Sequence, residues 1–371
     1  MSDNNILEGL NPAQRDAVIH RGGPMLVVAG AGSGKTRVLT HRIAHLIQQD
    51  NVSPFGILAI TFTNKAAQEM KDRVARLVGA VAEKMWVSTF HSACVRILRR
   101  DAERLGYPSA FSIYDQADAV RLTGYVVRDL GLDTKKFVPR AIHGRISNLK
   151  NDLISPDNAV DRAANIYDRK IAETYVEYQR RLRVAGAMDF DDLLTVTVEL
   201  FNNHPDVLDH YRQRFQHVLV DEYQDTNPAQ NDMVLKLADE HRNVFVVGDS
   251  DQSVYAFRGA DIRNILEFEK AFPDTSVVVL DQNYRSTQVI LDAANSVISN
   301  NLGRKPKDLW TDKSAGDKIV LYRADDEVDE SAWIIGELER LHQHGTLRWS
   351  DVAIFYRANA QSRIVEERLA S

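Results

Sequence analysis

The sequence predicts an α/β protein built around a parallel β-sheet, and three features of the chain support this prediction. Short apolar runs rich in β-branched residues recur along the chain. They lack a strict alternation of apolar and polar residues, which is typical of strands buried on both faces of a parallel sheet. Helical patterns separate the runs, as the crossover connections between parallel strands require.

The runs fall into two series that are separated by a helical segment. The strands predicted for the first sheet are MLVVAG (25–30), ILAITFT (57–63), MWVSTF (85–90), HVLVDE (217–222) and VFVVGD (244–249). Between Arg99 and Asp189 no convincing buried strand is found, and amphipathic patterns such as residues 163–183 predict a helical insertion. A second α/β domain is predicted to begin near Thr275. Its strands are expected at VVVLDQ (277–282), KIVLYRA (318–324) and DVAIFYR (351–357).

Composition narrows the class of protein. The chain has 371 residues, of which 44% are apolar and 26% charged, so an ordinary globular protein of two or three domains is expected. The single cysteine, Cys94, excludes an intramolecular disulfide and fits a reducing compartment. No signal peptide or membrane-length apolar run is found, so we expect a cytoplasmic protein without a membrane partner. A net charge of −6 excludes a strongly basic nucleic-acid protein but not a local basic groove.

Residues 29–36, AGAGSGKT, form a phosphate-loop pattern between a predicted strand and a predicted helix. Ala29 stands where the pattern usually has its first glycine. Glycines allow backbone N–H groups to approach phosphate oxygens, and those of this loop are Gly30, Gly32 and Gly34. Lys35 is expected to reach the β- and γ-phosphates, and the Thr36 hydroxyl to bind Mg²⁺. The alternative is a glycine-rich turn that only connects strand to helix, which the strand–loop–helix context disfavours.

An acidic pair follows the strand in HVLVDEYQDTN (217–227). The carboxyl ends of parallel strands share one edge of the sheet, and the phosphate loop is expected at that edge. Asp221 is expected to hold Mg²⁺ through water, and Glu222 to be the general base that activates the attacking water. A solvated pair that caps a strand is the alternative, although the run before it is too apolar for an exposed edge.

Two further loops follow predicted strands. In residues 244–260, Gln252 could sense the γ-phosphate by hydrogen bonding to it or to the attacking water. Tyr255 and Phe257 of the same loop could stack on bases or pack against the next domain, and these residues alone leave both open. In DQNYRST (281–287), Tyr284 could stack on a nucleotide base. Arg285 could reach the phosphates across a cleft as an arginine finger.

The motifs occur in one order along essentially the whole chain: LNPAQRDAV, AGAGSGKT, ILAITFTNKAAQEM, WVSTFHSACVRIL, DFDDLL, VLVDEYQDTN, VVGDSDQSVYAFRGA and LDQNYRST. This set resembles the superfamily 1A DNA helicases of the UvrD/PcrA/Rep type, and most of all UvrD/PcrA. The resemblance implies an ATP-dependent 3′-to-5′ DNA helicase and single-strand DNA translocase of DNA repair and replication. Mg²⁺ would be its cofactor and ATP its substrate. Single-stranded DNA, tailed duplex DNA and DNA repair proteins would be its partners.

The resemblance also implies roles at the nucleotide. Gln14 would contact the adenine edge, Tyr284 would stack on adenine, and Arg285 would contact the γ-phosphate. Gln252 would couple the γ-phosphate to the DNA site. The candidate nucleotide-binding residues are then Gln14, Ala29, Gly30, Ala31, Gly32, Ser33, Gly34, Lys35, Thr36, Arg37 and Tyr284.

The DNA contacts implied by the resemblance come from Phe62, His91, Tyr255 and Phe257. Relatives often carry Trp at the position of Phe257, so a smaller stacking surface is expected here. Two alternatives stay open: Phe62 could belong to the core, and His91 could cap a helix.

The family fold has two RecA-like motor domains. We therefore expect a first motor domain (1A) at residues 1–110 and 189–275, a helical insertion (1B) at 111–188, and the N-terminal part of a second motor domain (2A) at 276–371. The family's later motifs are not found, so the chain resembles the N-terminal portion of a longer helicase. Alone, it is expected to bind ATP but to show little DNA-stimulated hydrolysis. A nucleotide-gated DNA-binding module is the alternative, and the ordered aromatic motifs disfavour a phosphate-loop kinase or small-molecule ATPase.

Overall fold

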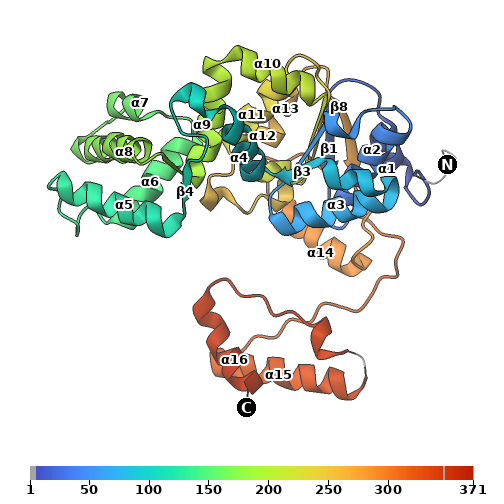
Figure 1. Cartoon of the computed structure of the whole chain (residues 1–371). Coiled ribbons are helices and arrows are strands. Elements are labelled where there is room, and N and C mark those ends of the chain that lie inside the picture. Colours follow the sequence, from blue (N-terminus) through green and yellow to red (C-terminus); the bar gives the residue numbers. More distant parts are fainter. Residues whose placement is uncertain (1–5, 346, 371) are drawn as a thin grey trace. The chain divides into compact units, whose positions relative to one another are not determined.

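The computed structural model describes residues 6–345 and 347–370, which form two compact units with a boundary in the chain between Ser314 and Ala315. Figure 1 follows the chain through both units. The first unit contains the sheet and every site discussed below. Within the described ranges, no helix combines the length and apolar character that crossing a bilayer demands.

A six-stranded parallel sheet organises the first unit, with strand order β3-β2-β6-β7-β1-β8. Its strands are β1 (Met25–Ala29), β2 (Ile57–Thr61), β3 (Trp86–Thr89), β6 (His217–Val220), β7 (Val244–Gly248) and β8 (Ser276–Leu280). The five strands predicted for the first sheet are confirmed. Every residue of β1, β2 and β7 is buried, which explains why these segments are apolar without alternation.

The placement predicted for the strand near residue 277 is wrong. This strand, β8, does not open a second sheet but pairs in parallel with β1, from Met25 opposite Ser276 to Ala29 opposite Leu280. Unlike the central strands it is exposed in part, since Val277 and Val279 are 40% and 39% exposed whereas Leu280 is only 1% exposed. A short apolar run fits either sheet equally well, so its partner could not be predicted locally. The division into motor domains remains a proposal.

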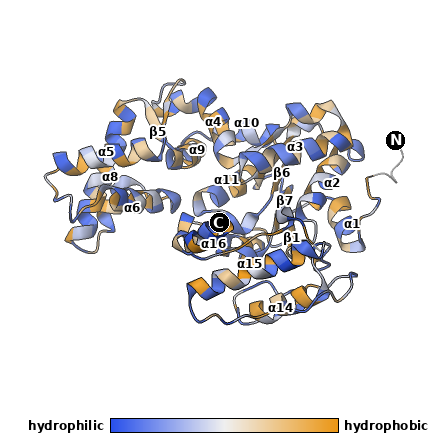
Figure 2. Ribbon diagram, turned by 90° about the horizontal axis from the view of Figure 1, so that it is seen from below, coloured by the Kyte–Doolittle hydropathy of each residue, from blue (hydrophilic) through white to orange (hydrophobic). Residues whose placement is uncertain are grey.

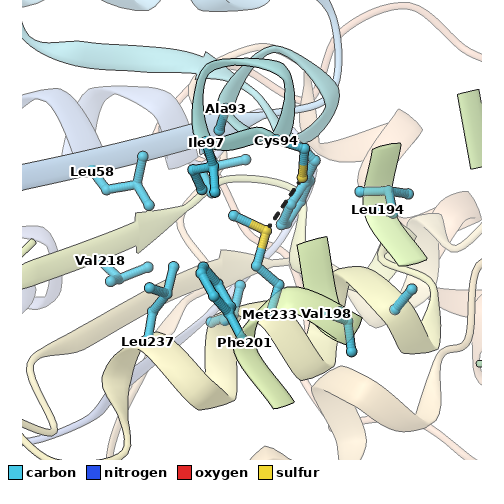
Figure 3. Packing of buried hydrophobic residues seen from close by; sticks show 14 of the residues in the cluster. Leu58, Ala93, Cys94, Ile97, Leu194, Val198, Phe201, Val218, Met233 and Leu237 are labelled. Carbon is cyan, nitrogen blue, oxygen red and sulfur yellow. Dashed lines mark hydrogen bonds between the residues drawn. The ribbon is translucent and has the colours of Figure 1, made fainter. Parts of the chain in front are cut away.

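Helices cover both faces of the sheet. One face is covered by α1 (Pro12–Ile19), α2 (Lys35–Gln48) and α3 (Asn64–Val78), and the other by α4 (Phe90–Asp101), α9 (Phe190–Asn203), α10 (Pro205–Arg214) and α11 (Pro228–Ala238). Neighbouring residues of β1 serve opposite faces, because Val27 belongs to one buried cluster and Val28 to the other. Figure 3 shows part of the second face, where the Cys94 sulfur lies 3.6 Å from that of Met233. Burial raises the pKa of the Cys94 thiol to about 12.

Shorter elements complete the first unit. The helices α12 (Arg263–Leu266), α13 (Phe268–Ala271) and α14 (Gln288–Ile298) follow β7 and β8. Short 3-10 helices lie at Pro54–Gly56, Ala80–Lys84, Ala102–Leu105, Tyr223–Asp225, Ser250–Gln252 and Ala256–Arg258. The chain after α14 returns to the loop that follows β7, because the buried Lys307 Nζ contacts Asp249 at 2.7 Å and Asp251 at 2.6 Å.

Helices occupy most of the segment that lacked predicted strands. They are α5 (Gln116–Asp129), α6 (Pro139–Asn151), α7 (Pro156–Asp161) and α8 (Ile166–Val184), and they share a buried cluster of their own. Figure 1 shows them grouped together, and Figure 2 shows hydrophilic and hydrophobic residues on each of α5, α6 and α8. Two short parallel strands, β4 (Ser112–Tyr114) and β5 (Ala187–Asp189), were not predicted and bracket the insertion.

The second unit contains α15 (Glu327–Gln343), α16 (Ser362–Ala370) and 3-10 helices at Trp349–Asp351 and Asn359–Gln361. The strands predicted at 318–324 and 351–357 are absent from its described residues. A strand needs a hydrogen-bonding partner, and neither segment finds one there. Leu321 and Phe355 are each 93% exposed as a result.

Candidate functional site

The phosphate loop connects the end of β1 to the start of α2. Gly32 (φ 66°) and Gly34 (φ 90°) adopt the left-handed backbone region that glycine tolerates best. The loop supports itself, because Ser33 donates to the Gly30 carbonyl through its backbone N–H (3.3 Å) and through its hydroxyl (2.8 Å). No side chain caps the N-terminus of α2. Its first N–H groups and its partial positive charge are therefore available to an anion.

Close neighbours also require glycine in this loop. A Cβ atom at Gly32 would lie 2.7 Å from Asn283 Nδ2, and one at Gly34 would lie 2.8 Å from Gln14 Nε2. At Gly30 it would lie 2.1 Å from the Leu309 side chain. Ala29, by contrast, is the last residue of β1 and is fully buried, so an alanine is accommodated at the first position of the pattern.

The acidic pair lies beside the lysine and threonine of the loop. Lys35 Nζ is 3.0 Å from Glu222 Oε2, and the Thr36 hydroxyl donates to Asp221 Oδ2 at 3.4 Å. Asp221 is 4% exposed. Its burial, and then the Glu222 carboxylate, raise the pKa of Asp221 to about 6, while Lys35 and Thr36 act in the opposite direction. The residues predicted to act on phosphates are thus brought together.

The oxygens of Thr36 and Asp221 fit a magnesium ion. Mg²⁺ keeps several waters in proteins and takes only one or two protein oxygens, so a larger cluster is unnecessary. No group of three or more His, Cys, Asp or Glu side chains that could hold a metal occurs in the part of the chain that the structure describes. A divalent cation here would offset both the burial and the Glu222 repulsion that raise the pKa of Asp221.

Gln14 supports the phosphate loop. It is fully buried, and its Nε2 donates to the Ser33 carbonyl at 2.7 Å. Its Oε1 accepts from the backbone N–H of Asn11 in the capping box of α1. Both ends of the amide therefore have partners within the chain, whereas the resemblance implied an adenine contact.

Asn283, which the sequence analysis missed, ties the loop after β8 to the phosphate loop. Its Nδ2 donates to the Ala31 carbonyl at 2.6 Å, and its Oδ1 accepts from the backbone N–H of Arg285 at 2.8 Å. The backbone N–H of Tyr284 donates to the Gly32 carbonyl at 3.0 Å. Arg285 was expected to reach across a cleft, but it lies in the same compact unit as the phosphate loop. The sequence signal for Asn283 was its place inside the motif DQNYRST (281–287).

A pocket of about 380 Å³ lies above the phosphate loop. It is lined by Gly32, Gly34, Lys35, Thr36, Arg37, Arg73, Glu222, Gln252, Tyr284 and Arg285. Cationic side chains outnumber the single carboxylate in this lining, which suits a polyphosphate. Arg73 comes from α3 and was missed, because an exposed arginine on an amphipathic helix carries no distinguishing pattern.

Gln252 connects this pocket to an exposed aromatic surface. Its amide nitrogen donates to Asp249 in the loop that follows β7. The same loop continues to Tyr255 and Phe257, which are 37% and 77% exposed. Their ring centroids are 6.1 Å apart, and the Arg258 guanidinium lies 5.2 and 5.5 Å from the two rings. Rings this exposed are available for stacking on bases.

A second aromatic surface lines a hollow of about 580 Å³ that contains Phe62 and His91. Phe62 is only partly buried and packs against the core cluster while it lines the hollow. The alternative that His91 caps α4 is wrong, because the Thr89 hydroxyl accepts the capping hydrogen bond from Ser92. Burial lowers the pKa of His91, which favours the neutral form of its ring.

Phe190 belongs to the same hollow and was missed. It is 48% exposed, and its ring centroid lies 6.0 Å from that of His91 in an edge-to-face arrangement. Its signal was an aromatic residue within the acidic motif DFDDLL, where Asp189 and Asp192 form the capping box of α9. Phe190 is the first residue of α9, and its side chain does not enter the core.

The fold and the pocket together define a class of protein. A phosphate loop after β1, an acidic pair after β6 and a polar residue after β7 meet at one edge of a parallel sheet, as in the phosphate-loop nucleotide-binding α/β proteins. Residues 10–273 match the UvrD/REP helicase N-terminal domain, and residues 278–371 match the UvrD-like helicase C-terminal domain. The chain belongs to the UvrD/REP helicase family, which confirms the resemblance inferred from its motifs.

Similar proteins include ATP-dependent DNA helicase PcrA of Bacillus subtilis (strain 168), which is 53% identical over 366 residues. The match covers 99% of this chain and 50% of that protein. ATP-dependent DNA helicase PcrA of Staphylococcus aureus (strain Mu50 / ATCC 700699) is 52% identical over 364 residues, covering 98% and 50%. ATP-dependent DNA helicase UvrD1 of Mycobacterium bovis (strain ATCC BAA-935 / AF2122/97) is 55% identical over 375 residues, covering 98% and 49%. The chain thus spans about half the length of these relatives.

Proposed function

We propose that the chain binds and hydrolyses ATP as the motor of a DNA helicase that moves 3′ to 5′ along single-stranded DNA. The observation that carries this proposal is the pocket of about 380 Å³, where Lys35, Thr36, Glu222 and Arg285 meet above one loop. The names of the similar proteins support the substrates, ATP and DNA. The direction of movement rests on the family resemblance. The cytoplasm is the proposed compartment, since the buried Cys94 thiol suits a reducing environment.

Each residue of the pocket is proposed to have its own role in ATP binding or hydrolysis. Lys35 and the arginines would neutralise the phosphates, with Arg285 placed for the charge that develops during transfer. Mg²⁺ would be held by the Thr36 hydroxyl and, through water, by Asp221, and it would supply positive charge at the phosphates. Glu222 is proposed as the general base that takes a proton from the attacking water. Its Oε2 lies at the pocket, 3.0 Å from Lys35.

Asp225 is the second carboxylate that could act as a base, and its setting is less suitable. It is 9% exposed and does not line the pocket. Burial and the Glu222 carboxylate raise the pKa of Asp225 to about 6. A raised pKa favours a general base, so it is the position of Asp225 outside the pocket lining that makes it the less suitable candidate.

DNA is proposed to bind along the two aromatic surfaces. Phe62, His91 and Phe190 line one hollow, and Tyr255 and Phe257 stand on the loop that begins beside Gln252. Base stacking on such rings tolerates any sequence, which suits a translocating enzyme. Both surfaces lie in the compact unit that holds the nucleotide pocket.

The test is a pair of binding titrations on the 371-residue chain, one with ATP and Mg²⁺ and one with an oligothymidine at several salt concentrations. Binding of both, with DNA affinity falling as salt rises, supports the proposal. A chain that binds neither ligand refutes it. The ATPase rate of the full-length protein with and without the oligothymidine then separates the two main functions. Stimulation by DNA identifies a translocase, whereas its absence indicates a nucleotide-gated DNA-binding module.

A further inference from the structure

Asn151 is a buried residue at the C-terminal end of α6, where the helical insertion meets the sheet-bearing part of the unit. It is 7% exposed. Its Oδ1 accepts from Asn227 Nδ2 at 2.6 Å, and its Nδ2 donates to the Ser147 carbonyl at 2.9 Å and to Asp191 Oδ1 at 3.3 Å. One side chain thus joins the insertion to the first residues of α9 and to the residue that caps α11.

The hydrogen-bond partners fix the orientation of this amide. Asn227 Oδ1 must accept from the Gln230 backbone N–H (2.8 Å) to cap α11, so its Nδ2 faces Asn151. Asn151 must then present its oxygen to Asn227 and its nitrogen to Ser147 and Asp191, which both accept. Only an amide of this length supplies an acceptor and a donor in these two directions. Aspartate would place a second carboxylate against Asp191.

The Asn227 side of this contact leads to the proposed general base. Glu222 and Asn227 belong to one compact turn, in which the Thr226 hydroxyl donates to the Tyr223 carbonyl at 2.7 Å. Gln224 Nε2 donates to Glu222 Oε2 at 2.9 Å within the same turn. A short, hydrogen-bonded segment therefore links Asn227 to the Glu222 carboxylate.

The other side of Asn151 faces the loop that carries Tyr255 and Phe257. A Cβ atom placed on Gly259 would lie 3.6 Å from the Asn151 Cβ, so this glycine packs directly against the amide-bearing side chain. Two residues further on, the Asp261 backbone N–H donates to the Thr226 carbonyl at 2.9 Å. The aromatic loop therefore touches both Asn151 and the turn that follows Glu222.

The residue before Asn151 anchors this junction. Lys150 Nζ lies 2.7 Å from Asp189 Oδ2 and 2.8 Å from Asp192 Oδ1, and all three side chains are at most 3% exposed. Removal of one partner would leave a buried charge uncompensated, which strongly destabilises a fold. The end of α6 is thus held firmly against the start of α9, which carries Phe190.

From these contacts we infer that Asn151 is a positioning residue that couples the nucleotide pocket to the DNA-binding loop through the helical insertion. The inference rests on the proposed function. Asn151 touches neither the nucleotide pocket nor the exposed aromatic rings. It fixes the position of the turn after Glu222 relative to the loop after Phe257, so that a ligand that orders one of them also orders the other.

The test measures coupling in the 371-residue chain. The dissociation constant of an oligothymidine is measured with and without a non-hydrolysable ATP analogue and Mg²⁺, and the ratio of the two values is the coupling factor. Asn151→Ala should leave each ligand's own affinity within about twofold. Couplings between sites typically span about 5- to 150-fold, and this variant should bring the factor to within about twofold of unity. Ser155→Ala is the matched control, since it removes the hydroxyl that caps α7 in the same insertion.

A second variant keeps the inference testable if Asn151→Ala folds poorly. Asn227→Asp retains a good cap for α11 but loses the Nδ2 donor that faces Asn151, so it should reduce the coupling factor in the same way. The double variant should be no worse than the more affected single variant, because both remove one contact.

Three outcomes would overturn the inference: a parent chain that binds both ligands without coupling, Asn151→Ala coupling equal to the parent's, or an equal loss in Ser155→Ala. Failure of the parent to bind either ligand would instead refute the proposed function.

Discussion

Replacement of Asp221 by asparagine should stabilise the ligand-free chain at pH 8 and weaken its binding of ATP with Mg²⁺. Burial and the Glu222 carboxylate raise the pKa of Asp221 to about 6 in the folded chain, against an ordinary 3.8. The folded chain therefore keeps this proton to higher pH than the unfolded chain. Stability falls as pH rises from about 4 to about 6 and stays lower above that range. Since each pKa unit corresponds to about 1.4 kcal/mol, ionised Asp221 costs up to about 3 kcal/mol above pH 7.

Asparagine avoids this cost and keeps the local geometry. Its Oδ1 can still accept from the Glu222 backbone N–H, which is 3.0 Å from Asp221 Oδ1. Its amide nitrogen can face the Thr36 hydroxyl. Urea unfolding without Mg²⁺ or nucleotide should show Asp221→Asn to be more stable than the parent by about 2–3 kcal/mol at pH 8. This advantage should shrink to roughly half at pH 5, where the parent's carboxyl is mostly protonated.

The control for this prediction is Asp16→Asn, on the exposed side of α1, which should show no such pH-dependent gain. The same preparations are titrated with ATP in the presence of Mg²⁺, where only Asp221→Asn should lose affinity. The reasoning would be refuted if Asp221→Asn were less stable than the parent at pH 8, or if its advantage were the same at pH 5 and pH 8.

The remaining predictions concern single side chains. Lys35→Ala should abolish productive ATP binding or turnover in the full-length protein, and hydrolysis at the parent rate would show that the site is misassigned. Glu222→Gln should keep nucleotide affinity and lose about 10²- to 10⁴-fold in turnover, the usual contribution of a positioned base. Near-normal turnover would transfer that role to another carboxylate. Phe257→Ala and Tyr255→Ala should each weaken oligothymidine binding by about 1–3 kcal/mol, as measured by fluorescence titration. Phe55→Ala, which removes another exposed ring, should leave it unchanged. Lost stability without lost affinity would favour a packing role.

The strands of the first sheet could be predicted because the residues of each strand themselves indicate that it is buried. Each residue of β1, β2 and β7 is buried, so an unbroken apolar run marks each strand. The sheet to which β8 belongs depends on a pairing with β1, which lies some two hundred and fifty residues earlier in the chain. No local pattern encodes such a partner. The segments around Leu321 and Phe355 look like strands for the same local reason, yet among the described residues neither has a neighbour to pair with.

The candidate site residues could be predicted where the role of a side chain follows from the motif in which it lies. Lys35, Thr36 and Glu222 follow from motif and strand context, and the structure places them together. Arg73 could not be found in this way, because only the packing of α3 beside the phosphate loop brings it to the pocket. The hydrogen-bond partners of Gln14 could not be predicted either, because they depend on where α1 packs in the fold.

The ion pair between Lys35 and Glu222 would act as an interlock on the proposed hydrolysis. With their 3.0 Å separation, the ammonium group that would bind phosphate already neutralises the carboxylate that would activate water. A phosphate that binds in the pocket would compete with Glu222 for Lys35, and the carboxylate would be released as the phosphate takes its place. Without a phosphate beside Lys35, a water molecule would meet a carboxylate that is still paired with the lysine. Binding of the substrate would thus free the proposed general base.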